Sequence, residues 1–190
     1  MTGKTRCSWP GDDPLYVAYH DEEWGVPVYQ SQQLFEKLIL DGFQAGLSWI
    51  TILRRKPGFL KAFDNFDPEK IARYGEDDIE RLMNDKGIIR NRLKVLSTIK
   101  NALIYLEMEQ EKTDNFSDFI WSFTDGKIIQ NEWEGIGQLP AETIESKAMS
   151  KALKKKGFKF CGPTICYAFM QAVGIVNDHD IHCFRHAELK

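Results

Sequence analysis

Apolar residues recur at intervals of three and four along most of this chain, which is the spacing of amphipathic helices. The pattern predicts one helix over residues 32–45, with Ser31 as its N-cap and Gly46 as its end. Its apolar stripe consists of Leu34, Phe35, Leu38, Ile39 and Gly42. A second helix is expected from about Ser48 to Pro57, with its apolar face formed by Trp49, Ile52 and Leu53.

Further helices follow from the same signals. Asp67 and Pro68 predict a short helix that Gly75 closes, and residues 77–84 predict another. The longest periodic segment is 88–111, whose inward face is expected to comprise Leu93, Leu96, Ile99, Leu103 and Leu106. Residues 116–123 indicate an aromatic helix or turn, and a last pair of helices should begin at Ser146 and be separated at 157–162. Residues 124–142 carry no assignable pattern, and strand patterns are nearly absent, so the fold is predicted to be all-α.

The chain has 190 residues, with 43% hydrophobic residues, 28% charged residues and a formal net charge of −3, which suits one large domain or two small ones built from interleaved segments. The charge excludes a bulk polycation, so any contact with nucleic acid must use a local basic face. No apolar run approaches a membrane span, and the first residues do not resemble a signal peptide, so a cytoplasmic location is expected. In a reducing compartment cysteines act as thiols or metal ligands, and Cys161 and Cys166, among apolar neighbours, are expected in the core.

Two short segments at opposite ends of the chain supply a possible metal site. His179 and Cys183 are four residues apart, which would place them on one face of a helical turn, and Cys7 and His20 supply a second Cys and His. Together they form a Cys₂His₂ set, which is common for tetrahedral structural zinc. The alternative is two unrelated free cysteines and two surface histidines.

The segment 153–165 combines lysines with two glycines before a helix that opens at Pro163 and Thr164. Gly157 and Gly162 would permit a tight reversal with positive φ, with Phe158 and Phe160 packed on the core. Unpaired backbone N–H groups at such a turn favour a phosphate oxygen, and Lys159 adds local positive charge. The alternative is an ordinary turn with solvated lysines.

A carboxylate on an apolar stripe is the third feature. Asp41 follows Leu34 by seven residues and Leu38 by three, so it should be buried, with a raised pKa unless donors surround it. It is either a site residue or a structural acceptor, which caps a neighbouring helix or pairs with a buried backbone N–H. Nearby, Gly46 and Leu47 could form an exposed tip between two helices or fold back onto the core. The fourth feature is a set of aromatic residues: Trp9, Tyr16, Tyr19, Trp24 and Trp49. Such a set would suit a flat, electron-poor ring, although aromatic residues usually belong to the core.

These residues, taken in order, resemble the DNA-3-methyladenine glycosylase I family over nearly the whole chain. The resemblance rests on Cys7-x-Trp9, Asp13–Tyr16, Tyr19–Asp21, Glu23–Pro27, Gln44–Trp49, Gly87–Arg90, Gly157–Phe160 and Val176–His179. It implies an all-α helix-hairpin-helix fold with a structural zinc ion that joins the two termini. The implied arrangement is a single unit, with residues 1–30 and 145–190 forming the zinc-clasped region around the hairpin at 157–162. Residues 31–144 would form the helical body.

The resemblance also implies an activity: hydrolysis of the N-glycosidic bond of 3-methyladenine in double-stranded DNA, with release of the free base. The implied zinc ligands are Cys7, His20, His179 and Cys183. The implied catalytic residues are Asp41, Tyr19 and Trp49, with Tyr16 and Trp9 also binding the base. The implied DNA contacts are Gly46, Leu47, Gly157, Lys159, Gly162 and Thr164. A monomer with no organic cofactor and no membrane contact is expected.

Two positions limit what the resemblance implies. The family usually has Glu where this chain has Asp41, which shortens the side chain by one methylene. Related helix-hairpin-helix glycosylases often place a catalytic Asp two residues before the His that aligns with His179, and that position here is Asn177. Asp178 is expected to orient local structure instead. Two other functions remain: a damaged-DNA-binding protein of this fold that has lost turnover, and a metal-dependent hydrolase, which four protein ligands disfavour.

Overall fold

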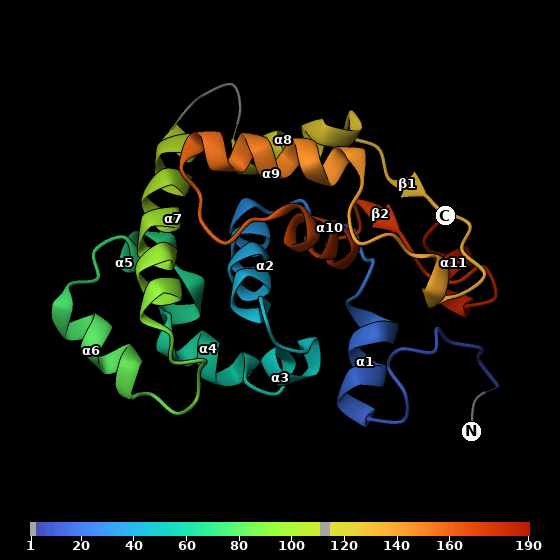
Figure 1. The fold of residues 1–190 in the computed structure, drawn as a ribbon, viewed down its shortest axis with the longest axis horizontal. Helices are drawn as coiled ribbons and strands as arrows, with labels where there is room; N and C mark the ends of the chain where they lie inside the picture. The colour runs from blue at the N-terminus through green and yellow to red at the C-terminus, as the bar shows by residue number, and fades with distance from the viewer. Residues whose placement is uncertain (1–2, 111–114) are drawn as a thin grey trace.

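Helices make up most of the structure, a computed structural model that describes residues 3–110 and 115–190 (Figure 1). The α-helices are α1 (Pro14–Glu22), α2 (Ser31–Gln44), α3 (Trp49–Leu53), α4 (Lys56–Ala62), α5 (Pro68–Ile71), α6 (Glu76–Asn84), α7 (Arg92–Gln110), α8 (Phe116–Trp121), α9 (Ile144–Lys156), α10 (Pro163–Ala172) and α11 (Phe184–Glu188). Short 3₁₀ turns are η1 (Asp64–Phe66), η2 (Ser122–Thr124) and η3 (Ile136–Gln138). Within the described ranges, no helix is long and apolar enough to span a membrane.

Helix α2 lies at the centre of the molecule and contacts α3, α7, α8 and α10 (Figure 1). The predicted stripe of this helix is buried, including Leu34, Phe35 and Leu38. Asp41 lies on the same stripe and is 1% exposed, as the sequence predicts. The core therefore forms around a helix that carries one buried carboxylate near its C-terminal end.

The predicted inward face of α7 is wrong at three positions and correct at Ile99 and Leu106, which are partly buried and pack against the core. Leu93, Leu96 and Leu103 are 69%, 40% and 48% exposed, whereas the buried face consists of Lys94, Val95, Thr98, Asn101, Ala102, Ile104, Tyr105 and Met108. The helix is rotated about its axis relative to the prediction, because the Lys94 ammonium donates hydrogen bonds of 2.8 Å to the carbonyls of Phe43 and Ala45, at the end of α2. Terminal carbonyls of a helix lack intrahelical partners and attract a cation. The predicted end of α7 at Glu111 lies outside the described residues.

Several predicted helix boundaries are also shifted. Helix α3 ends at Leu53, and Pro57 lies in the first turn of α4, where proline is tolerated. Helix α7 begins at Arg92 rather than at 88. Helix α9 begins two residues before Ser146, because Thr143 caps it and exchanges hydrogen bonds with Ser146.

The unassigned segment 124–142 contains one short strand. Residues of β1 (Ile129–Gln130) pair in parallel with β2 (Val176–Asn177), with Ile129 opposite Val176. Two residues are too few to produce an alternating pattern, so this pairing leaves no signal in the sequence. The rest of the segment continues through η3 to α9.

The turn between α9 and α10 reverses at different residues from those predicted. Gly157 caps α9 with a φ of 105°, but Gly162 has a φ of −65°, and Phe160 takes the other positive value, 54°. Phe158 is buried as expected, whereas Phe160 is 37% exposed. The N–H of Lys159 donates to Asn101 of α7 at 2.9 Å, so this group is paired inside the protein, contrary to the prediction of unpaired turn N–H groups.

Asp178 directly follows β2 and joins its own segment to the segment after β1 and to α10. This confirms the prediction that it orients local structure. Its two carboxylate oxygens accept hydrogen bonds from Asn131 (2.6 Å), Trp133 (2.8 Å), Tyr167 (2.5 Å) and Gln171 (2.8 Å). The carboxylate is buried, so these donors replace its water.

We expect Asp178→Asn to lower the free energy of unfolding by about 3 kcal/mol, because the amide nitrogen would face donors that require an acceptor. Denaturant unfolding of the variant measures this loss. Asp12→Asn, at an exposed position, serves as the control and should change stability by less than about 0.5 kcal/mol. A loss equal to that of the control would show that the four hydrogen bonds contribute no net stability.

Candidate functional site

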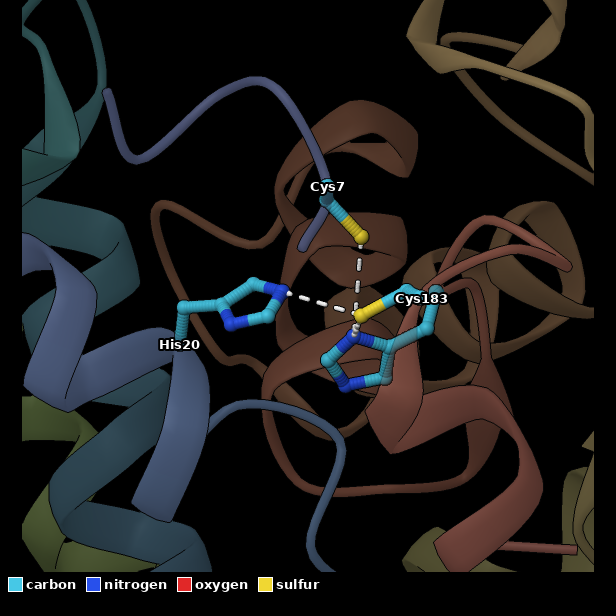
Figure 2. A group of neighbouring side chains, drawn as sticks. Cys7, His20 and Cys183 are labelled. Carbon is cyan, nitrogen blue, oxygen red and sulfur yellow. Dashed lines mark hydrogen bonds between the residues drawn. The ribbon is translucent and has the colours of Figure 1, made fainter. Parts of the chain in front are cut away.

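Two cysteines and two histidines from opposite ends of the chain meet in the interior. The Sγ atom of Cys183 lies 3.5 Å from Nε2 of His20 and 3.6 Å from Nδ1 of His179, and Sγ of Cys7 lies 3.6 Å from the same Nδ1. All four side chains are buried, with their ligand atoms within 4.8 Å of one another. Figure 2 shows Cys7, His20 and Cys183 pointing toward one another from the N-terminal segment, α1 and the C-terminal segment.

The three sulfur–nitrogen distances of 3.5–3.6 Å fit a tetrahedral metal ion. Sulfur and nitrogen ligands at ordinary zinc distances are about 3.5 Å apart when the geometry is tetrahedral. Hydrogen bonds with the Cys7 thiol and with the two imidazoles hold the pKa of the Cys183 thiol well below its usual range. The four residues could therefore hold a metal ion.

Outer contacts orient both imidazoles. Nδ1 of His20 lies 2.8 Å from a carboxylate oxygen of Asp21, which also accepts two-pronged hydrogen bonds from Arg6. Nε2 of His179 lies 3.1 Å from the carbonyl oxygen of Trp24. Each imidazole can thus donate its outer N–H and turn an unprotonated nitrogen toward the cluster, which is how metal-binding histidines are usually held.

The prediction that His179 and Cys183 share a helical turn is wrong. Residues 178–182 form a bend and turn after β2, and Cys183 is the N-cap of α11. The N–H of Ile181 donates to the carbonyl of Trp133 at 2.8 Å, a contact with a distant segment that a local helix would prevent. The two side chains still converge because the turn folds back on itself.

A cavity of about 220 Å³ lies beside the cluster and collects the predicted aromatic residues. Its lining from the N-terminal half consists of Trp9, Tyr16, Tyr19, Trp24, Lys37, Asp41, Gln44 and Trp49, and from the C-terminal half of Ile136, Leu139, Ala168, Gln171 and Ala172. An apolar cavity of about 150 Å³ can hold a benzene ring. This cavity can therefore admit a flat heteroaromatic ring.

The aromatic walls are tilted rather than parallel. The rings of Tyr19 and Trp49 are 5.4 Å apart at 42°, and Tyr16 stacks near Tyr19 at 6.5 Å and 29°. Trp9 packs edge-on against Tyr16 and Trp24. Burial, together with the charge of Asp41, raises the pKa of Tyr19 well above its usual range, so its hydroxyl stays protonated.

Asp41 supplies the buried charge of the cavity. Its Oδ1 accepts a hydrogen bond of 2.5 Å from Lys37, and Oδ2 is buried with no hydrogen-bond partner among the described residues. Burial raises the pKa of Asp41, while the Lys37 charge opposes the rise. An unpaired buried oxygen is costly in a native protein and indicates a place for a ligand's N–H.

Sequence reasoning missed Lys37 and Gln171. Lys37 precedes Asp41 by four residues, so the helical spacing of an ion pair was the available signal. Gln171 carried no local signal, since only the folding of α10 against α2 and the bond to Asp178 bring it to the cavity. Asn177 is not among the cavity-lining residues; its side chain donates to Gln130 and to the carbonyl of His186.

The predicted DNA contacts lie on two loops that adjoin the cavity's helices. Gly46 (φ 84°) and Leu47, which is 41% exposed, connect α2 to α3. Gly157, Lys159 and Gly162 belong to the turn before α10, and Thr164 lies in the first turn of that helix. Each loop is attached to a helix that lines the cavity, α2 and α3 for the first loop and α10 for the second. The loop residues themselves do not line the cavity.

The sequence matches a known protein family and a named relative. Residues 9–186 match the family model described as methyladenine glycosylase. The chain is 52% identical over 178 residues to DNA-3-methyladenine glycosylase 1 of Escherichia coli (strain K12), covering 94% of this chain and 95% of that protein.

Solved structures agree with this match. A crystal structure of 3-methyladenine DNA glycosylase I superposes with a TM-score of 0.92 at 51% identity, covering 95% of this chain and 98% of that one. A variant of such an enzyme in complex with 3-methyladenine superposes with a TM-score of 0.90 at 37% identity, covering 94% and 96%. The chain belongs to the methyladenine glycosylase family.

Proposed function

We propose that this protein is a base-excision repair glycosylase that hydrolyses the N-glycosidic bond of 3-methyladenine in alkylated DNA. The observation that carries the proposal is the buried, unpaired Oδ2 of Asp41 inside a cavity walled by tyrosine and tryptophan. Such a cavity suits an electron-poor ring that presents an N–H group. Membership of the family and the 3-methyladenine bound to a relative support the same substrate.

The chemistry requires little acid catalysis. A purine methylated at N3 is cationic within the nucleotide, so it leaves as a neutral base when both electrons of the N9–C1′ bond move to it. Water adds to C1′ and loses a proton, which leaves an abasic site. Tyr19 and Trp49 would contact the cationic ring, Tyr16 and Trp9 would complete the wall, and Asp41 would accept from the base amine. Asn177 offers no carboxylate to stabilise a sugar cation, so bases that leave poorly should resist cleavage.

We further propose that α9, the turn at 157–162 and α10 form a helix-hairpin-helix that holds one DNA backbone. The N–H groups in the first turn of α10, including that of Thr164, have no intrahelical partner and can donate to a phosphate. Lys159 adds positive charge at the turn, and contacts of this kind position a protein without reading bases. Leu47 would enter the stack that the extracted nucleotide leaves, at a flipping cost of a few kcal/mol.

The four-residue cluster is proposed to bind one structural zinc ion. The bound ion would supply a crosslink between the two ends of the chain, and its four protein ligands leave no position for substrate. The crosslink matters because the N-terminal segment and α1 carry Trp9, Tyr16 and Tyr19, one wall of the cavity.

A protein of the same fold that binds damage without turnover is the second candidate, because Asp41 is shorter than the family's usual Glu. Methylated DNA distinguishes the two candidates. We expect chromatography of the released bases to show free 3-methyladenine in excess of 7-methylguanine. Tight binding of an abasic-site duplex without base release would favour the second candidate, and absence of both would contradict the proposed function.

We expect Asp41→Asn to weaken binding of free 3-methyladenine roughly tenfold or more, because a hydrogen bond to a charged acceptor is lost. Titration calorimetry measures the change, and thermal unfolding reports whether the variant folds. Glu36→Gln is a matched control on the same helix, since Glu36 does not line the cavity. Equal affinities of Asp41→Asn and the native protein would remove Asp41 from the site.

Leu47→Ala should reduce base release from duplex DNA by roughly tenfold while leaving binding of the free base unchanged, because only duplex requires the vacated stack to be filled. Leu103→Ala, another half-exposed leucine, provides the control. A parallel loss of free-base binding would mean that Leu47 supports the pocket rather than the DNA.

Metal analysis of protein purified without added zinc should give about one equivalent. Chelation should lower the melting temperature by more than about 10 °C, because binding energy at such a site is folding energy. His182→Ala changes a histidine outside the cluster and should retain the metal. Metal-free protein of normal stability would contradict the zinc proposal.

A further inference from the structure

Lys37 is a charged group inside the cavity that the roles described above do not use. Its ammonium lies 2.5 Å from Oδ1 of Asp41 and 3.7 Å from the centroid of the Trp49 ring. The side chain is only 16% exposed, and the residue lines the same cavity as Asp41 and Trp49. A cation thus already occupies the two features, carboxylate and indole face, that suit a cationic base.

The ion pair leaves one acceptor and further donors free. Oδ2 of Asp41 has no partner, and Lys37, with three N–H groups, donates one hydrogen bond within the described ranges, to Asp41. Both residues come from one face of α2, four positions apart, so their polar ends lie side by side. The cavity therefore presents an adjacent donor and acceptor rather than a carboxylate alone.

We propose that Lys37 is a specificity-determining residue that donates to the N7 atom of the base while Asp41 accepts from its N6 amine. This inference rests on the proposed glycosylase function. Adenine carries this acceptor and donor side by side on its major-groove edge, whereas guanine carries two acceptors there, N7 and O6. The pair would read 3-methyladenine through two hydrogen bonds, and it would set the Asp41 carboxylate against O6 of any guanine. A purine methylated at N7 would lose the bond to Lys37.

The arrangement accommodates the positive charge of the substrate. The methyl group at N3 lies across the purine from the edge that carries N6 and N7. The Lys37 ammonium would therefore approach the ring at the edge opposite the methyl group. Lys37 has a flexible four-carbon chain, which allows its ammonium to leave the Trp49 face for the base edge and keep its bond to Asp41. The cationic ring then takes the place of the ammonium on the indole.

The simplest alternative is that Lys37 only neutralises Asp41. Replacing one ring atom of the ligand separates the two roles. The analogue 3-methyl-7-deazaadenine has a C–H in place of N7 and keeps the amine that faces Asp41. Neutralisation of Asp41 is unaffected by this exchange, whereas a hydrogen bond from Lys37 is lost.

Titration calorimetry with both ligands tests the inference on the native protein, Lys37→Met, Lys37→Gln and the control Lys56→Met. Lys56 pairs with Glu23 and does not line the cavity. We expect the native protein and Lys56→Met to prefer 3-methyladenine over the deaza analogue by roughly 10- to 100-fold, the effect of a charge-assisted hydrogen bond. Lys37→Met should show no preference, and Lys37→Gln, whose amide can still donate, an intermediate one.

Equal binding of the two ligands by the native protein would overturn the inference, as would a full preference in Lys37→Met. Tighter binding of 3-methyladenine by Lys37→Met would also overturn it, because the ammonium would then merely occupy the ligand's space. The native protein and Lys37→Gln keep the test decisive if Lys37→Met does not fold. Failure of the native protein to bind or release 3-methyladenine would instead count against the proposed function.

Discussion

The burial of the Asp41 carboxylate is the constraint on which the rest of the site depends. A charge on the apolar stripe of α2 must be compensated, and the fold supplies one compensating group, Lys37, from the same helix. One carboxylate oxygen is left without a partner in a cavity walled by aromatic rings. The protein therefore keeps part of the desolvation cost uncompensated until a ligand enters, which is a common property of binding sites.

The Cys/His cluster joins the segment that supplies the second wall of this cavity to the other end of the chain. Asp41 and Lys37 belong to the central helix, but Tyr16, Tyr19 and Trp9 belong to the N-terminal segment and α1, at the edge of the molecule (Figure 1). Cys7 and His20 bring this segment against His179 and Cys183 near the other end of the chain. The recognition chemistry and the proposed metal crosslink are thus coupled through a short stretch of sequence.

Periodicity and motif order were sufficient to predict the helical class, the buried stripe of α2, the four residues of the cluster, and the aromatic residues and the carboxylate of the cavity. They failed where a distant contact decides the outcome. Lys94 turns α7 by bonding to the carbonyls that end α2, so leucines predicted to be inside are exposed. The β1–β2 pair and Gln171 likewise depend on tertiary contacts, which leave no local pattern. The division of the chain into a zinc-clasped region (residues 1–30 and 145–190) and a helical body (residues 31–144) remains a prediction.

The most direct test of the central claim is a crystal structure of the protein with bound 3-methyladenine. We expect the ring in the cavity against Trp49 or Tyr19, with its amine within about 3.2 Å of Oδ2 of Asp41. A base bound elsewhere, or a carboxylate that turns away from it toward solvent, would contradict the claim that the unpaired Oδ2 of Asp41 binds the lesion.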